Sequence, residues 1–243
     1  MRALLTPRWI IAHVVVLAVS VGFVSLGMWQ LSRLEERRLA NTVGESRFEA
    51  EPVDVALLVS SAGSDLDSLS PHRALATGTF APESEVLIRS QVYLGVAGFH
   101  VITPLVTEDG SAVLVNRGWV PLDLDQIPVA AAPPPSGAVM VEGWLATTQT
   151  RRALGPADPE DGQLVAMNRV DIARIQEQVP FPLLPVYLVA IGEQGSELPI
   201  PVDPPVFDDE GPHLAYAIQW FSFLIIGLVG YGSLMRKSLR GSV

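Results

Sequence analysis

Hydrophobic positions form two kinds of pattern along this chain, and the first kind is a pair of long apolar runs. The run at 9–29 reads WIIAHVVVLAVSVGFVSLGMW and has His13 as its one ionisable residue. The second run, Leu214–Met235, carries no charge. A helix of about 21–22 residues rises ~30 Å, which is enough to cross a bilayer. The two runs therefore predict transmembrane helices at 9–29 and 213–235.

The residues that flank these runs predict how the chain is oriented. The first run is longer than the core of a signal peptide and ends in GMWQL rather than at a small-residue cleavage site, so we interpret it as an uncleaved anchor. Arg236 and Lys237 follow the second run, and basic flanks stay in the cytoplasm. The tails, 1–8 and 236–243, are therefore expected to be cytoplasmic and residues 30–212 extracytoplasmic. The sequence predicts a multi-pass protein of the cell membrane.

The second pattern is an alternation of apolar and polar positions between the two runs. Short segments rich in Val, Ile and aromatic residues are separated by Gly, Pro or Asp, which is typical of antiparallel strands. The predicted strands are 73–80, 85–90, 98–106, 111–120, 138–146 and 184–191. Asp109 and Gly110 predict a tight turn between two of these strands.

Four further segments complete the predicted organisation. Residues 30–47 continue the first helix out of the membrane, and residues 170–179 form a short amphipathic helix that begins at Asp171. Residues 49–70 are expected to be irregular, and residues 193–212 to form an extended arm rich in proline. The predicted fold class is α+β and membrane-anchored. Two transmembrane helices flank a β-rich extracytoplasmic domain, which is an antiparallel sheet or partly closed barrel with one or two short helices.

Charge and composition narrow the range of functions. All 26 acidic residues lie between the two runs, where 11 arginines leave a net charge of −15. An acidic exterior argues against nucleic acid as a partner. The chain has no cysteine, so neither a disulfide framework nor a thiolate metal site is available. Lipid is the expected contact of the two apolar runs.

Candidate chemistry begins where the second run starts, in the stretch HLAYAIQWF. His213, Tyr216 and Trp220 share one face of the predicted helix. One interpretation is an aromatic belt at the membrane interface, where Tyr and Trp are common. The other is a neutral imidazole offered as an axial ligand to a haem iron, with the two aromatic side chains beside the ring.

The outer end of the first run carries a related set, Trp29, Gln30 and Arg33. Trp29 and Arg33 are four residues apart and so share a helix face. An arginine at this level pairs well with a carboxylate such as a haem propionate. The alternative is contact with the lipid surface, since arginine often extends toward phosphates there.

A third set lies in the predicted strand that reads LVNRGWVP, at 114–121. Asn116, Arg117 and Gly118 interrupt a good strand, and glycine there permits a bulge or a close backbone approach. One interpretation is structural, with Trp119 buried and Arg117 in an ion pair. The other is a surface that docks a partner or a propionate.

The remaining histidines do not form a metal site by their spacing. His13 lies ~24 Å along the helix from Trp29, too far to share one haem with His213, and a hydrogen bond between the helices is the favoured interpretation. His72 and His100 have no ligand partner at a metal-binding spacing. Motifs for hydrolases, metalloproteases and phosphate binding do not occur in the sequence, so we do not expect an enzyme.

Three of these stretches occur together and in order, GMWQLSRL at 27–34, VLVNRGWVP at 113–121 and HLAYAIQWF at 213–221. In this combination the sequence resembles the surfeit-locus (Surf-one-like) family of cytochrome c oxidase assembly factors. The resemblance covers the whole architecture, although residues 41–70 and 147–210 match only loosely. One departure is Gly211-Pro212 before the histidine, where more polar residues are expected.

The resemblance implies a role in maturing the haem-bearing subunit of cytochrome c oxidase, with other assembly factors as further partners. It implies transient binding of haem a, with His213 at the position of the histidine proposed to bind the haem iron. The other signature positions are Trp29, Gln30, Arg33, Tyr216, Trp220 and the stretch from Asn116 to Pro121, which includes Arg117. The alternative is a haem-free membrane scaffold that stabilises an oxidase assembly intermediate.

Overall fold

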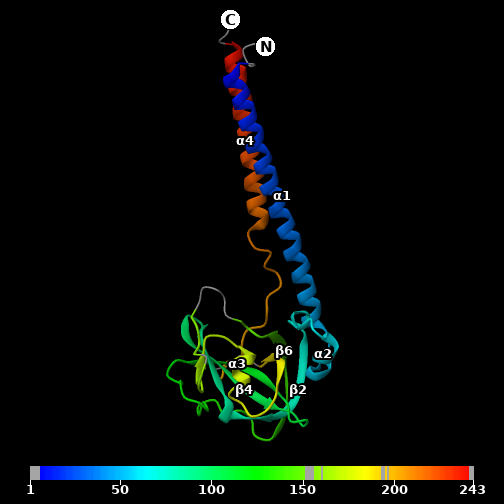
Figure 1. Cartoon of the computed structure of the whole chain (residues 1–243), viewed down its shortest axis with the longest axis vertical. Coiled ribbons are helices and arrows are strands. Elements are labelled where there is room, and N and C mark those ends of the chain that lie inside the picture. Colours follow the sequence, from blue (N-terminus) through cyan, green and yellow to red (C-terminus); the bar gives the residue numbers. More distant parts are fainter. Residues whose placement is uncertain (1–5, 151–155, 160, 193–194, 196, 241–243) are drawn as a thin grey trace. The chain divides into compact units, whose positions relative to one another are not determined.

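The computed structural model describes residues 6–150, 156–159, 161–192, 195 and 197–240. The chain divides into two compact units, which we call the helix pair and the barrel unit (Figure 1). The helix pair comprises Met1–Val43 and Val206–Val243, and the barrel unit is Gly44–Pro205. The predicted tails fall partly outside the described residues.

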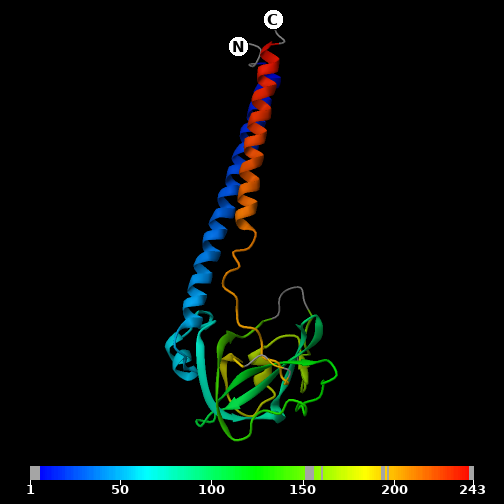
Figure 2. The same ribbon diagram turned by 180° about the vertical axis from the view of Figure 1, so that it is seen from behind.

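The helix pair consists of α1 (Pro7–Glu49), which continues into the barrel unit, and α4 (His213–Arg240), with the start of α1 and the end of α4 at the same end of the pair (Figures 1 and 2). Both helices are long and apolar enough to cross a membrane. The helices approach closely at Gly27, where a β-carbon would lie 2.6 Å from Cζ of Phe221. Small residues at such contacts let helix backbones pack tightly in lipid.

Further along the pair, the hydroxyl of Tyr231 and Nδ1 of His13 form a hydrogen bond. The predicted hydrogen bond between helices at His13 is therefore confirmed. α1 is one continuous helix through residues 30–47, so the predicted extension of the first apolar run is also confirmed.

The barrel unit contains the strands and the short helices. The strands are β1 (Val53–Asp54), β2 (Arg73–Phe80), β3 (Val86–Tyr93), β4 (Val96–Val106), β5 (Ala112–Pro121), β6 (Ala138–Thr147), β7 (Ala166–Met167) and β8 (Leu183–Ala190). The short helices are α2 (Val55–Ala62), η2 (Leu66–Leu69), η3 (Pro82–Ser84) and α3 (Ile172–Gln176). Each predicted strand matches one of these strands closely, and Asp171 caps α3 by accepting from the Arg174 amide.

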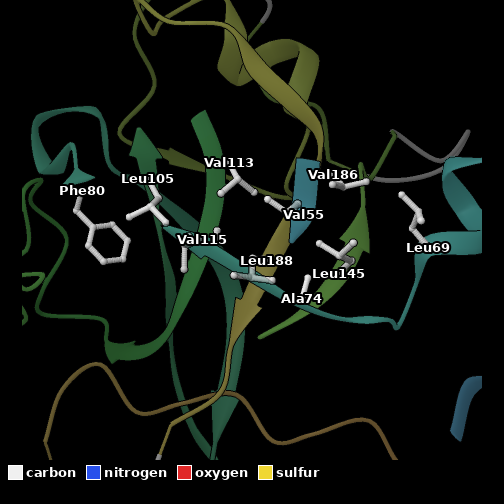
Figure 3. Packing of buried hydrophobic residues seen from close by; sticks show 11 residues of the cluster. Val55, Leu69, Ala74, Phe80, Leu105, Val113, Val115, Leu145, Val186 and Leu188 are labelled. Atoms are coloured by element: carbon white, nitrogen blue, oxygen red, sulfur yellow. The ribbon is translucent and has the colours of Figure 1, made fainter. Parts of the chain in front are cut away.

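Five strands close into a barrel in the order β2-β6-β8-β5-β4, because β4 also pairs with β2. Inward side chains from these strands converge on a common interior, with Val55 of α2 among them (Figure 3). Leu105, Leu145 and Leu188 are fully buried there. Burial of apolar area at about 25 cal/mol per Å² is the main favourable contribution to a core of this kind. Closure also removes the exposed edges of these five strands.

Two predictions about this unit were wrong. The predicted alternative of a barrel is confirmed, and the barrel is closed rather than partly closed, but antiparallel pairing throughout is wrong, since β5 and β8 run parallel. A parallel pair needs a long crossover, and α3 lies on the connection that precedes β8. The segment 49–70 is not irregular, because it holds β1, α2 and η2. Asp54 caps α2 by accepting from the amide of Ala56 at 2.9 Å, and this cap lets a short Ser- and Ala-containing helix form.

Candidate functional site

The candidate site lies in the helix pair, where α4 begins beside α1. His213 is the first residue of α4, and the Tyr216 amide already donates to the Pro212 carbonyl. The residues just before His213 are bound to α1 by an ion pair and a hydrogen bond. Arg38 makes a bidentate ion pair with Glu210, with Nε and Nη2 at 2.7 and 2.9 Å from its two oxygens. The side-chain Nδ2 of Asn41 donates to the backbone carbonyl of Asp209 at 3.1 Å.

This attachment fixes the level along α1 at which His213 lies. The hydrogen bond from Arg38 lowers the pKa of Glu210 below its ordinary value, so the carboxylate stays charged. Bidentate arginine–carboxylate pairs add geometric precision as well as attraction. The start of α4 is thus held in register with the part of α1 that follows Gln30.

The imidazole of His213 contacts α1 directly. Its Nδ1 lies 2.9 Å from Oε1 of Gln30. Gly211 lies at another edge of the ring, because a β-carbon there would be 3.5 Å from Cδ2 and 3.6 Å from Nε2 of His213. Gln30 and Gly211 both come from segments identified in the sequence.

A hollow of about 320 Å³ adjoins the imidazole and is lined by Arg33, Glu36, Arg37, Ala40 and His213. Arg33 lies over the ring of Trp29, with Cζ 6.0 Å from the centroid. It also donates to a carboxylate oxygen of Glu36 at 2.7 Å. Two guanidinium groups and one carboxylate leave the lining with a net positive charge, which favours an anionic ligand.

The predicted aromatic residues are placed differently from one another. Trp220 stacks on Phe23 of α1 with ring centroids 5.8 Å apart, so it belongs to the packing between the helices. Tyr216 is 47% exposed and Trp29 is 52% exposed. Among the described residues, the lining of the hollow includes none of these three aromatic rings.

Sequence reasoning did not find Glu36, Arg37 and Ala40 as lining residues. The only signal was position, since Arg37 follows Arg33 by one helical turn and therefore shares its face. The ion pair between Arg38 and Glu210 had a weak signal too, in the opposite charges of residues 33–38 and 208–210.

Arg117 lies in the barrel unit, and its side chain contacts buried residues of the same unit. The register of β4 and β5 shifts between Val101 and Ile102, which leaves Arg117 at the predicted bulge. Its side chain is 7% exposed, and Nη2 lies 2.7 Å from Oε1 of Glu85, whose side chain is fully buried. Its Nε donates to Thr103 at 2.8 Å. These contacts favour the structural interpretation of Arg117 over contact with a cofactor.

The rest of this bulge is structural as well. The amide of Gly118 donates to Oδ1 of Asn116 at 3.1 Å. Trp119 and Ile200 exchange two backbone hydrogen bonds, which attach the returning arm to β5. The side chain of Trp119 is buried beside Tyr93. The stretch from Asn116 to Trp119 in β5 therefore forms a bulge and binds the returning arm at Ile200.

His100 gives the barrel a predicted pH dependence. Burial lowers the pKa of His100 from 6.5 to about 4. The unfolded chain therefore takes up the proton first, and stability declines as pH falls from 6.5 toward 4 by up to about 1.4 kcal/mol per pH unit. Urea unfolding of the full chain should show a shallower decline for His100→Gln. An equal pH dependence in the two proteins would contradict this prediction.

These features define a class of protein, a closed β-barrel that is inserted in the chain between two apolar helices, with a histidine beside an arginine-lined hollow in the helix pair. The chain belongs to the SURF1 family, whose model matches residues 17–225. The resemblance stated from the sequence is thereby confirmed.

Three relatives illustrate the match. An uncharacterised SURF1-like protein of Mycobacterium bovis is 29% identical over 245 residues, which cover 98% of this chain and 87% of the relative. A SURF1-like protein of Rickettsia felis is 25% identical over 224 residues, or 90% of this chain and 94% of the relative. A SURF1-like protein of Monosiga brevicollis is 29% identical over 241 residues, or 91% and 86%. The matches extend over both units of the chain.

Proposed function

We propose that this chain is a membrane-anchored assembly factor of cytochrome c oxidase. In this proposal it holds haem a transiently through His213 and passes it to the haem-bearing subunit, without catalysing a reaction itself. Membership of the SURF1 family supports the assembly role. The observation that carries the haem role is the imidazole of His213 beside a hollow that is also lined by Arg33 and Arg37.

The proposed membrane arrangement uses α1 and α4 as the two spans. The start of α1 and the end of α4 lie at the same end of the helix pair, as two spans require (Figures 1 and 2). The basic residues after Met235 favour a cytoplasmic location for that end. His213 then lies at the outer surface of the membrane, and the barrel unit is extracytoplasmic.

The donor groups present fit a haem as cargo. A neutral imidazole is a common axial ligand of haem iron, and guanidinium groups pair with propionates. In this proposal Arg33 and Arg37 contact the carboxylates, and the exposed rings of Trp29 and Tyr216 offer apolar contact. A single protein ligand suits a carrier, because the cargo must leave again.

The experiment is an absorption spectrum of the full chain purified from cells that make haem a. We expect a Soret band in the wild type and at least about a tenfold loss of bound haem in His213→Ala, since the iron loses its protein ligand. His13→Ala is the matched control, because it removes the other histidine of the helix pair, and it should keep the band.

Other outcomes separate the parts of the proposal. A Soret band of equal strength in His213→Ala would exclude His213 as the ligand. No band in any variant, with oxidase assembly still dependent on the chain, would favour the haem-free scaffold. If the double variant with Arg33→Gln and Arg37→Gln retained haem like the wild type, the proposed propionate contacts would be rejected. The rest of the proposal would stand.

A further inference from the structure

The hydrogen bond between His213 and Gln30 selects which ring nitrogen carries the proton. The amide oxygen of Gln30 accepts hydrogen bonds and lies 2.9 Å from Nδ1, an arrangement that is a hydrogen bond when the proton is on Nδ1. The neutral ring then has its lone pair on Nε2. The opposite tautomer would require the Gln30 amide to turn over, so that its NH2 group donates to an unprotonated Nδ1.

Gly211 lies beside that second nitrogen. Its φ of +68° is a conformation that glycine adopts freely, and its amide donates to Oδ1 of Asp209 at 2.8 Å. A β-carbon at this position would be in van der Waals contact with the ring edge, 3.6 Å from Nε2. A longer side chain at this position would begin at the ring edge, next to the nitrogen that carries the lone pair.

We propose that Gln30 is a positioning residue that holds His213 as the Nδ1-protonated tautomer, and that Gly211 keeps Nε2 accessible to the ligand. Nε2 is then the ligating atom, and Gln30 acts through the imidazole rather than by touching the cargo. A hydrogen bond on the far nitrogen commonly fixes the orientation and basicity of a ligating histidine. The ligand in this inference rests on the proposed function, whereas the tautomer of His213 does not depend on it.

Tautomer and ligand binding are measured separately in the full chain in detergent. The chain has four histidines, so selective ¹⁵N-histidine labelling gives four ring systems, and His213→Ala assigns the relevant one. In the haem-free wild type at mildly alkaline pH, we expect Nδ1 of His213 to be protonated and Nε2 to have the shift of an unprotonated nitrogen. Gln30→Leu should lose this preference, and Gln30→Glu should keep it because a carboxylate also accepts.

Iron protoporphyrin is the binding probe, titrated by absorbance. We expect Gln30→Leu to weaken binding by about 10- to 100-fold and Gln30→Glu to retain it. Gly211→Asn should weaken binding while the tautomer stays unchanged. Asparagine tolerates positive φ, so this variant tests coverage of Nε2 rather than backbone strain.

The possible failures are distinguishable. A wild-type His213 with its proton on Nε2, or a tautomer that is unaltered in Gln30→Leu, would overturn the role of Gln30 even if haem binds. Full binding by Gly211→Asn would overturn the role of Gly211. Equal probe binding by wild type and His213→Ala would instead reject the proposed function and leave the tautomer result standing.

Discussion

Replacement of Arg117 by methionine is expected to lower the free energy of unfolding of the barrel unit by about 3–5 kcal/mol. The fully buried carboxylate of Glu85 accepts from Arg117, from the Thr103 hydroxyl and from the Val129 amide. Methionine replaces the aliphatic part of the arginine side chain and has no charge. The variant would leave the Glu85 carboxylate buried without its counter-charge. This unpaired, desolvated charge lowers the free energy of unfolding.

Urea unfolding of the full chain in detergent, followed by hydrogen exchange of the β4 and β5 amides, measures this loss. Arg89→Met is the matched control, because Arg89 is on neighbouring β3 with 47% of its side chain exposed, 3.8 Å from Asp158. It should cost at most about 1 kcal/mol, because the carboxylate of Asp158 keeps its contacts with Arg169 and Asn168 when the half-exposed Arg89 is removed. Equal small losses in the two variants would mean that the pair between Arg117 and Glu85 is not buried in solution.

Local patterns were sufficient for most of the secondary structure. The continuous α1 follows from an apolar run and the charged helical segment after it, and the strands follow from alternation. The parallel pairing of β5 with β8 was missed because it joins segments far apart in the chain, and no local signal records it. α2 was missed because its Ser and Ala content resembled a loop, although Asp54 provides a good cap.

The candidate site shows the same division between local and distant information. His213, Gln30 and Arg33 stood out because each lies at the end of an apolar run. The contact between His213 and Gln30 depends on how each helix is rotated, which apolar periodicity leaves open within a broad face. Arg117 was ambiguous because a bulge interrupts the alternation that assigns side chains to the inside or outside of a strand.

Gly118→Ala is the second change with a large expected effect, a loss of at least about 2 kcal/mol together with release of the returning arm. Gly118 has φ of +127°, and a β-carbon there would lie 2.2 Å from the carbonyl oxygen of Ile200. That oxygen belongs to the backbone, so no side-chain rotation relieves the clash. The arm must move away, and the two hydrogen bonds between Trp119 and Ile200 break.

Hydrogen exchange of the Trp119 and Ile200 amides in the full chain reports this release, alongside urea unfolding. Gly110→Ala is the matched control, because Gly110 also has positive φ, +83°, but has nothing within 4 Å of its β-carbon position. Its free energy of unfolding should fall only by the strain of a β-carbon at positive φ, about 1–2 kcal/mol. Exchange at Trp119 and Ile200 should stay unchanged. If Gly118→Ala matched this control in both measurements, backbone strain alone would explain Gly118. A larger loss with faster exchange at both amides would instead show that glycine is required there because the arm lies against it.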